Sequence, residues 1–278
     1  YDHSIVKLLP LEDDDGDSST FINANYVPGY ASQREYIACQ GPLPCTIDDF
    51  WRMVWEQNVH IIVMLTLCKE DGRQKCELYW PMESNEAKQY GDIVVQTINF
   101  SNINTYEQRI FKISVGEKSR TVKHFHFLQW RDFSADVKND VLVDFIQNVR
   151  SHASVPEKRT PMVIHCSAGV GRTGTYIALD HLMQFINEHD FESTIDIFNM
   201  VYTMRKNRCY MVQTEQQYIF IHDCVQDMIE KKRQREIDAL NGGDDMYGNT
   251  IVDNIYENKA FDADEPELYQ NVDLKNQP

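Results

Sequence analysis

Apolar and polar positions alternate along two neighbouring stretches of the chain, residues 109–115 and 120–127. This alternation is typical of half-buried β-strands, and Gly116-Glu117-Lys118 between the two stretches is typical of a turn. We therefore predict a β-hairpin over these residues. Further strands are predicted at the apolar runs 61–67, 93–98 and 162–164.

Other stretches repeat their apolar residues at helical spacing. Thr46, with Asp49 three residues later, has the spacing of a capping pair and predicts a helix from Thr46. Residues 141–149 have a helical period as well. Further helices are predicted from Arg172, Thr194 and Thr214. Strands that alternate with helices in this way indicate an α/β fold with a mixed sheet.

Residues 237–278 differ in composition from the rest of the chain. They carry ten acidic and two basic residues, which is half of the formal charge of −16, and they show no sustained helical or strand period. Such a segment buries too little apolar surface to fold, so we predict a disordered acidic tail. Residues 1–236 contain no Pro-, Gly- or Ser-rich linker and are predicted to form one domain.

The charge of −16 disfavours nucleic acid or an anionic membrane surface as the main partner. No apolar run approaches the roughly 20 residues of a membrane-spanning helix. The chain begins with Tyr1 and has no charged segment followed by an apolar stretch. We therefore expect a fragment or a processed product without a targeting signal of its own.

The seven cysteines are irregularly spaced and include no Cys-x-x-Cys pair. This pattern disfavours a disulfide framework or a structural zinc site, and it favours a reducing cytosolic setting. We expect six of the cysteines to be small buried hydrophobes and Cys166 to be the exception.

Residues 163–175 combine a short apolar strand, a loop of small residues and the start of a helix. Gly169 and Gly171 allow successive backbone N–H groups to point inward, and the dipole of the following helix adds positive potential at the same place. Cys166 lies at the base of this nest, where the amides and Arg172 are expected to keep it a thiolate near neutral pH.

Arg172 is six residues after Cys166 and is able to hold two phosphoryl oxygens in a bidentate fork. Thr173 would place a hydroxyl near the sulfur and stabilise the thiolate as a leaving group. The alternative is a buried structural cysteine in a glycine-rich turn. A Cys followed at the sixth position by Arg-Thr, with glycines between, favours an anion-binding loop with a nucleophile.

The signature loop of the cysteine-dependent protein tyrosine phosphatases is similar to His165-Cys166-Ser167-Ala168-Gly169-Val170-Gly171-Arg172-Thr173-Gly174. Nearly the whole domain resembles this family, and the single-catalytic-domain receptor type with a Tyr-bearing tail is the most similar. The resemblance implies a mixed twisted sheet flanked by helices. The matching segments outside the loop are residues 1–4, 21–26, 40–44, 49–55 and 75–81.

The resemblance also implies the chemistry, which is hydrolysis of phosphotyrosine in proteins without a metal or another cofactor. The Cys166 thiolate attacks phosphorus while an acid protonates the departing phenolate, and water then hydrolyses the cysteinyl-phosphate. The loop amides and the Arg172 guanidinium stabilise the equatorial oxygens. The substrate-binding residues so implied are Ser167, Ala168, Gly169, Val170, Gly171, Arg172 and Gln217, with His165 in support.

The general acid of the family lies on a mobile loop with the pattern Trp-Pro-Asp, and the matching segment is Trp130-Arg131-Asp132. Asp132 is therefore implied as the acid and Trp130 as the anchor of the loop. Arg131 replaces the proline, which adds backbone freedom and places a positive charge beside the acid. Asp132 could also be an ordinary solvated loop residue.

Two further segments have counterparts in the family. Gln213 is implied to orient the hydrolytic water, and Gln217 to support it and contact phosphate, although Thr214 with Gln217 is also a capping box. Glu70 is implied to orient Arg172, and Lys75 to meet the acid loop; taken alone, both are turn charges. The family's substrate-recognition loop and N-terminal helices would precede Tyr1, so we expect the domain to lack them.

Three tyrosines of the predicted tail, Tyr247, Tyr256 and Tyr269, share the motif Tyr-x-Asn. Exposed tyrosines among acidic residues suit tyrosine kinases, and phosphotyrosine-x-Asn resembles the ligand of Asn-selective adaptor SH2 domains. Three such motifs in one tail favour docking over coincidence, and the same tyrosines are candidate substrates of the domain itself.

The leading hypothesis is a protein tyrosine phosphatase in the intracellular region of a single-pass plasma-membrane receptor, a placement implied by the resemblance alone. Two alternatives stay open. One is a pseudophosphatase that binds phosphotyrosine with weak turnover, which Arg131 favours. The other is a scaffold whose tail recruits SH2 adaptors.

Overall fold

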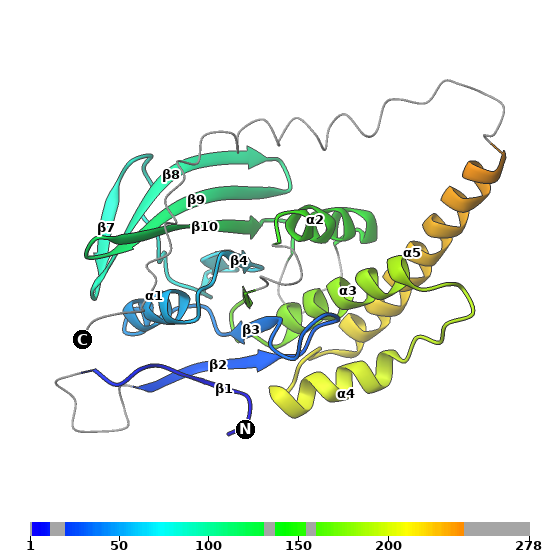
Figure 1. The fold of residues 1–278 in the computed structure, drawn as a ribbon, viewed down its shortest axis with the longest axis horizontal. Coiled ribbons are helices and arrows are strands. Elements are labelled where there is room, and N and C mark those ends of the chain that lie inside the picture. The colour runs from blue at the N-terminus through cyan, green and yellow to red at the C-terminus, as the bar shows by residue number, and fades with distance from the viewer. Residues whose placement is uncertain (1, 12–19, 131–136, 154–159, 242–278) are drawn as a thin grey trace, which may run out of the picture. The chain divides into compact units, whose positions relative to one another are not determined.

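A computed structural model of the chain describes residues 2–11, 20–130, 137–153 and 160–241. Within these ranges, nine strands form one mixed twisted sheet with helices on both faces, as the sequence predicts (Figure 1). Across the sheet, the strand order is β1-β2-β3-β11-β4-β10-β9-β8-β7. These strands are β1 (Ile5–Lys7), β2 (Phe21–Val27), β3 (Tyr36–Cys39), β4 (Ile61–Met64), β7 (Ala87–Tyr90), β8 (Ile93–Ile103), β9 (Tyr106–Val115), β10 (Lys118–Phe127) and β11 (Met162–His165).

The remaining elements are one small hairpin and five helices. The hairpin pairs β5 (Lys69–Glu70) with β6 (Arg73–Gln74) in antiparallel fashion. The helices are α1 (Ile47–Glu56), α2 (Asn139–Ser151), α3 (Gly171–Glu188), α4 (Ile197–Asn207) and α5 (Glu215–Asn241).

The centre of the sheet is parallel and buried on both faces. Strand β11 pairs with β3 on one side and with β4 on the other, and β4 pairs with β10, all in parallel. Every residue of β3, β4 and β11 is buried. Their apolar runs are therefore continuous rather than alternating, as expected for parallel strands covered on both sides.

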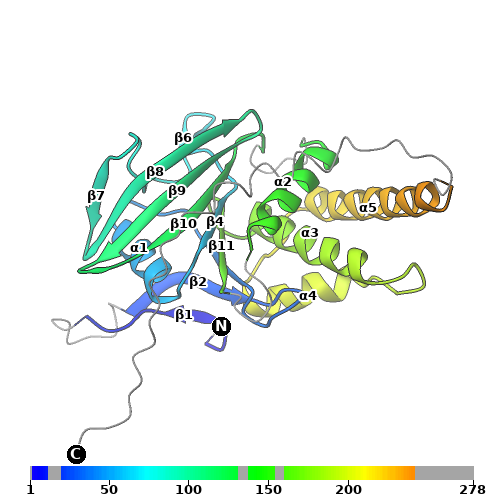
Figure 2. The ribbon, with the colours of Figure 1, turned by 45° about the horizontal axis from the view of Figure 1, so that its top comes forward.

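Adjacent residues of β11 face different hydrophobic cores. Val163 packs in a core with Trp51 of α1, and Ile164 packs in a core with Phe145 of α2. Because successive side chains of a strand point to opposite faces, α1 lies on one face of the sheet and α2 on the other. Figure 2 shows the same separation of α1 from α2 and α3.

The predicted hairpin is confirmed. Strands β9 and β10 are antiparallel, Val115 lies opposite Lys118, and Gly116 in the connecting turn has φ +55°. Other predictions need correction. Strand β8 continues to Ile103 instead of residue 98, and α4 begins at Ile197 instead of Thr194. Strand β4 ends at Met64 instead of residue 67. Thr46 is the N-cap residue of α1 but makes no side-chain capping bond, because its hydroxyl accepts a hydrogen bond from the Leu43 N–H at 2.9 Å.

The last helix passes the predicted boundary of the tail. Because α5 continues to Asn241, residues 237–241 are helical, whereas the sequence pattern placed them in the disordered segment. The rest of the predicted tail, with Tyr247, Tyr256 and Tyr269, lies outside the described residues.

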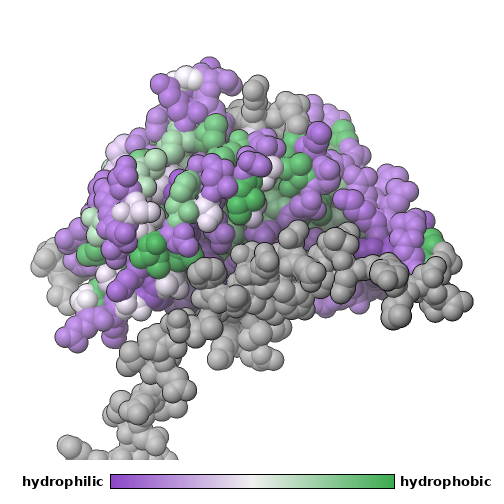
Figure 3. Space-filling model, turned by 90° about the horizontal axis from the view of Figure 1, so that it is seen from above, coloured by the Kyte–Doolittle hydropathy of each residue, from purple (hydrophilic) through white to green (hydrophobic). Residues whose placement is uncertain are grey.

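The prediction of six buried cysteines is only partly right. Cys39, Cys76 and Cys224 are buried, but Cys68 is half-buried, and Cys45 and Cys209 are exposed. The face in Figure 3 is mostly hydrophilic, with hydrophobic side chains in separate areas. None of the described helices is both long and apolar enough to span a membrane.

Candidate active site

Cys166 lies in the loop that connects β11 to α3. It follows His165, the last residue of the central parallel strand, and is only 4% exposed. The N–H of Gly169 donates a hydrogen bond to Cys166 Sγ at 3.3 Å. The loop thus turns one of its backbone amides toward the sulfur.

Gly169 is required where the loop turns back. Its φ is +71°, and a Cβ at this position would lie 2.0 Å from the backbone oxygen of Cys39 at the end of β3. A side chain would therefore be strained by its backbone conformation and would also collide with a neighbouring strand. The loop keeps its curvature because no residue larger than glycine fits there.

Arg208 holds the outer side of the loop. Its guanidinium donates hydrogen bonds to the carbonyl oxygens of Ala168 at 3.1 Å and Gly169 at 2.8 Å. The Oδ1 atoms of Asn23 and Asn25 on β2 accept from the same guanidinium at 3.0 and 2.8 Å. Burial lowers the pKa of Arg208. Sequence reasoning missed this residue, because it ends a basic stretch with no motif and its partners come from a distant strand.

Arg172 is buried, and its guanidinium forms two hydrogen bonds with the Glu70 carboxylate. Nη1 donates to Glu70 Oε1 at 2.7 Å, and Nη2 donates to Oε2 at 3.3 Å. The two other described partners are the carbonyl oxygen of Trp130, 2.9 Å from Nη1, and the hydroxyl of Thr66, 3.1 Å from Nη2. The structure thus brings together three of the predicted site residues, Arg172, Glu70 and Trp130.

The β5–β6 hairpin presents Glu70. Asp71 and Gly72, between the two strands, both have positive φ, of +48° and +78°, which is the geometry of a tight type I′ turn. Oε1 of Glu70 accepts hydrogen bonds from the Thr66 hydroxyl at 2.9 Å and the Leu67 N–H at 3.0 Å. Lys75 follows the hairpin and is half-buried, and its N–H donates to the Cys68 carbonyl at 2.9 Å.

His165 joins Cys166 to a chain of buried polar groups. Its Nδ1 is 3.2 Å from the Cys166 carbonyl oxygen, and its Nε2 is 2.7 Å from the hydroxyl of Tyr79. The same hydroxyl is 2.8 Å from Nε2 of His124. Because a carbonyl only accepts, His165 Nδ1 carries the proton, so Tyr79 donates to His165 and accepts from His124. Burial lowers the pKa of His165 to about 3, which keeps its ring neutral.

Gln213 and Gln217 lie beside the loop, at the start of α5. Gln217 is buried, and its Oε1 accepts from the N–H groups of Gln213 at 3.0 Å and Thr214 at 3.3 Å. The Gln217 N–H donates to the Thr214 hydroxyl at 3.2 Å, so the capping box is formed. A Cβ at Gly171 would lie 3.0 Å from the amide of Gln217, so this side chain closes against the loop as well.

Gln213 is exposed and follows a strained turn. Val212, the residue before it, is buried and has a φ of +57°, which is rare for a β-branched residue. Arg205 fixes this turn by donating to the carbonyl oxygens of Met211 at 2.9 Å and Val212 at 2.7 Å. The backbone that leads into Gln213 is therefore held by Arg205.

The other loop residues differ in exposure. The hydroxyl of Thr173 is buried and has no hydrogen-bond partner among the described residues. Ser167 is half-buried, and its carbonyl accepts from the Gly41 N–H at 2.9 Å. Ala168 is exposed, and the Val170 carbonyl accepts from the Val212 N–H at 3.1 Å.

Trp130 is the last described residue before the predicted acid. Its side chain is 2% exposed and packs near Phe220 of α5, with ring centroids 6.3 Å apart. Arg131 and Asp132 lie outside the described residues, so the position of the predicted acid is not part of this geometry.

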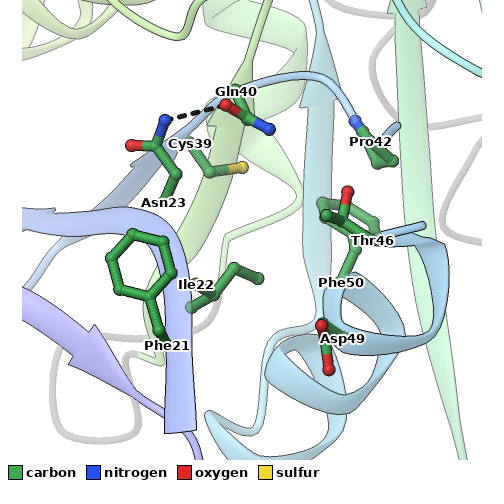
Figure 4. A pocket seen from close by; sticks show the side chains of 9 residues that line it. All are labelled: Phe21, Ile22, Asn23, Cys39, Gln40, Pro42, Thr46, Asp49 and Phe50. Carbon is green, nitrogen blue, oxygen red and sulfur yellow. Dashed lines mark hydrogen bonds between the residues drawn. The ribbon is translucent and has the colours of Figure 1, made fainter. Parts of the chain in front are cut away.

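A cavity of about 200 Å³ lies between β2, β3 and α1 (Figure 4). Asn23 donates to Gln40 at 2.7 Å at its rim, and Cys39 and Phe50 are among its lining residues. None of the predicted catalytic residues lines it. In the described part of the chain, His, Cys, Asp and Glu side chains form no group of three or more that could hold a metal ion.

Comparisons with known proteins find similarity over most of the chain. The family model described as protein-tyrosine phosphatase matches residues 1–227. Receptor-type tyrosine-protein phosphatase eta of Gallus gallus is 43% identical over 260 residues, which cover 93% of this chain and 18% of that protein. Receptor-type tyrosine-protein phosphatase zeta of Homo sapiens is 41% identical over 265 residues, which cover 91% of this chain and 11% of that protein.

A third relative is named for a different substrate. Phosphatidylinositol phosphatase PTPRQ of Homo sapiens is 43% identical over 232 residues, which cover 84% of this chain and 10% of that protein. The chain thus spans 10 to 18% of the length of these three relatives.

Proposed function

Because this chain belongs to the protein-tyrosine phosphatase family, we propose that it hydrolyses phosphotyrosine in proteins through a cysteinyl-phosphate intermediate. One observation carries the proposal. Cys166 accepts a hydrogen bond from the Gly169 amide in a loop whose next helix presents the buried Arg172, already held in a fork by Glu70. A guanidinium that is fixed in place and backbone amides that point into the loop bind the oxygens of a phosphoryl dianion, and the thiolate supplies the nucleophile that attacks its phosphorus.

In the first proposed step, the Cys166 thiolate attacks phosphorus, and the bond between phosphorus and the phenolic oxygen breaks. Asp132 gives its proton to the departing oxygen, so the product leaves as neutral tyrosine. The loop amides and Arg172 stabilise the charge on the three equatorial oxygens. For this, Nη1 of Arg172 would exchange the Trp130 carbonyl for a phosphoryl oxygen.

In the second proposed step, water attacks phosphorus and the bond between sulfur and phosphorus breaks. Gln213 orients the water, Asp132 takes its proton, and Cys166 leaves as a thiolate. The buried hydroxyl of Thr173, which has no partner among the described residues, would stabilise this thiolate. Gln217 fixes the Gln213 backbone through the hydrogen bond from the Gln213 N–H, which supports a positioning role for both glutamines.

Hydrolysis of para-nitrophenyl phosphate, with and without EDTA, tests this proposal. We expect turnover that EDTA does not change and that Cys166→Ser abolishes. Asp132→Ala should lower kcat by about 10²- to 10⁴-fold with little change in KM. Asp136→Ala, four residues later in the sequence, is the matched control and should leave kcat unchanged. An Asp132→Ala variant as fast as wild type would refute the acid assignment.

Arg131 distinguishes an enzyme from a binding module. If Arg131 prevents loop closure, the wild type will bind a phosphotyrosine peptide with negligible turnover, and Arg131→Pro will restore hydrolysis. Turnover in the wild type at a rate within about tenfold of Arg131→Pro excludes the pseudophosphatase.

Phosphotyrosine is favoured over a phosphoinositide as substrate. One relative is named a phosphatidylinositol phosphatase, but this chain has a formal charge of −16, which repels an anionic lipid surface. We expect release of phosphate from a phosphotyrosine peptide to exceed release from vesicles that contain phosphatidylinositol phosphates. The reverse order would reassign the substrate.

We propose further that the chain is the intracellular catalytic region of a longer receptor-type protein, as the names and lengths of its relatives suggest. Phosphorylated Tyr247, Tyr256 and Tyr269 would dock adaptor SH2 domains through their shared Tyr-x-Asn motif. Capture of an Asn-selective SH2 domain by peptides around Tyr256 tests this docking. We expect binding by the phosphorylated peptide only, and equal binding by the unphosphorylated peptide would refute it.

A further inference from the structure

A buried polar cluster on β9 and β10 has no part in the proposed chemistry. It consists of His126, which is 6% exposed, Arg109, which is 4% exposed, and the half-buried Glu107. Arg109 donates to Glu107 Oε2 at 2.8 Å, while its Nε and Nη1 have no hydrogen-bond partner in the described ranges. Burying such groups without hydrogen-bond partners is costly.

His126 connects this cluster to the segment that follows β4. Its Nε2 is 2.8 Å from the carbonyl oxygen of Thr66. Because this oxygen only accepts, Nε2 carries the proton. Nδ1 is 3.6 Å from Glu107 Oε2, which is too long for a hydrogen bond. The neutral ring therefore donates its single N–H group to the carbonyl oxygen of Thr66.

Thr66 is the neighbour that Glu70 and Arg172 share. Its hydroxyl donates to Glu70 Oε1 at 2.9 Å and accepts from Arg172 Nη2 at 3.1 Å. The next N–H, of Leu67, also donates to Glu70. The position of the Thr66–Leu67 backbone therefore determines where the Glu70 carboxylate meets the Arg172 guanidinium. The side chain of His126 holds this backbone through the Thr66 carbonyl.

The segment that follows β10 contacts Arg172 from a second side. Four residues after His126, the carbonyl oxygen of Trp130 accepts from Arg172 Nη1 at 2.9 Å. Arg172 is thus contacted directly by Trp130, three residues after β10, and indirectly by His126 of β10 through Thr66.

We propose that His126 is a positioning residue for Arg172, acting through the hydrogen bond from its Nε2–H to the Thr66 carbonyl. This inference rests on the proposed function, in which Arg172 binds the phosphoryl group. A displacement of about 1 Å at such a group costs up to about 10²-fold in rate.

Arg109 and Glu107 preserve the tautomer that this role needs. The Arg109 guanidinium lies 5.2 Å from the ring centroid of Trp80 and 4.7 Å from that of Phe100, and it engages the Glu107 carboxylate. Without this cation, the carboxylate would attract the ring proton to Nδ1 and away from Thr66.

The charged and titratable groups around His126 come from three strands. Burial lowers the pKa of His126 and keeps its ring neutral near pH 7. The groups that face it are Glu107 and Arg109 on β9, His124 on its own strand and His165 on β11.

Two substitutions of His126 separate positioning from packing. The amide nitrogen of His126→Gln reaches the place of Nε2 and keeps the donor, whereas His126→Asn is too short. We expect His126→Asn to lower kcat for para-nitrophenyl phosphate by about tenfold or more, and His126→Gln to recover most of the loss. The control is His152→Phe, which removes a half-buried histidine at the end of α2 and should leave kcat unchanged. Equal kcat values for the Gln and Asn variants would overturn the proposal.

Affinity for orthovanadate, measured by calorimetry, tests the same geometry without turnover. We expect His126→Asn to weaken vanadate binding by about tenfold in the wild type but by less than twofold in the Glu70→Gln background, because both act through one fork. Additive losses would refute the shared path. A wild type that binds vanadate but hydrolyses nothing would refute the proposed function and leave the positioning of Arg172 still measurable.

Discussion

Arg172 and Glu70 form a buried ion pair in which each guanidinium nitrogen of the fork meets one carboxylate oxygen, at 2.7 and 3.3 Å. The two side chains are 1% and 7% exposed. The pair joins α3 to the small β5–β6 hairpin, far apart in the sequence. A buried pair is costly to form but more costly to break, because one charge is then left without its partner.

Glu70→Gln should therefore harm both stability and turnover. The amide keeps one acceptor but removes the charge, so Arg172 loses its orientation. We expect kcat/KM for para-nitrophenyl phosphate to fall by about 10²-fold and the free energy of unfolding by about 3 kcal/mol. Urea titration measures the second quantity. Asp71→Asn, an exposed residue of the same hairpin, is the matched control; a similar loss there would mean that hairpin charge alone is responsible.

Gly169→Ala tests the close approach of the loop to β3. The added Cβ would meet the Cys39 carbonyl oxygen at 2.0 Å, so the loop has to shift, and hydrolysis should be nearly lost. Gly116→Ala is the control, because Gly116 also has a positive φ, of +55°, but nothing lies within 4 Å of the added atom. The control should cost only about 1 kcal/mol of strain in thermal unfolding and no activity. Full activity in Gly169→Ala would contradict the close approach.

Arg208→Lys examines the support behind the loop. Lysine keeps the charge but cannot reach the carbonyls of Ala168 and Gly169 and both asparagines together. We expect kcat/KM to fall by at least about tenfold and the free energy of unfolding by about 2 kcal/mol, measured in urea. Lys206→Met, two residues away and exposed, should leave both unchanged. Equal losses in the two variants would assign the effect to surface charge.

Local patterns predicted much of the fold. The hairpin of β9 and β10 and the buried strand β11 are specified by alternation and by a continuous apolar run, which are properties of neighbouring residues. The end of β4 was wrong for a tertiary reason. Leu65 and Leu67 continue the apolar run of the strand, but the Thr66 hydroxyl and the Leu67 N–H donate to Glu70 instead of continuing the ladder.

The residues of the site were predictable where they follow one another in the sequence. The loop from His165 to Gly174 has a distinctive order of residue types, and Glu70 could be assigned only through the family resemblance. Arg208, Thr66 and Tyr79 were missed, because each acts through contacts with residues distant in sequence. A single sequence contains no signal for such contacts.

Low pH should lower the free energy of unfolding, because buried histidines are neutral in the folded state. His165 has its pKa lowered to about 3, mainly by burial, while an unfolded histidine titrates near 6.5. Between these values, the unfolded chain binds a proton that the folded chain does not. Stability therefore rises with pH across this window and is lost as the pH falls below about 6.5, by up to about 1.4 kcal/mol per pH unit for one such group.

Comparison of wild type with His165→Asn isolates this contribution. Asparagine cannot be protonated in this range, and its amide can still donate to the Cys166 carbonyl, so other titrating groups contribute equally to both proteins. From urea unfolding at pH 6.5 and 4.5, we expect the wild type to lose about 2 kcal/mol more than the variant over that interval. Parallel stability curves for the two proteins would mean that His165 takes up a proton in the folded state as readily as in the unfolded chain, and the tautomer assigned to the chain through Tyr79 to His124 would be wrong.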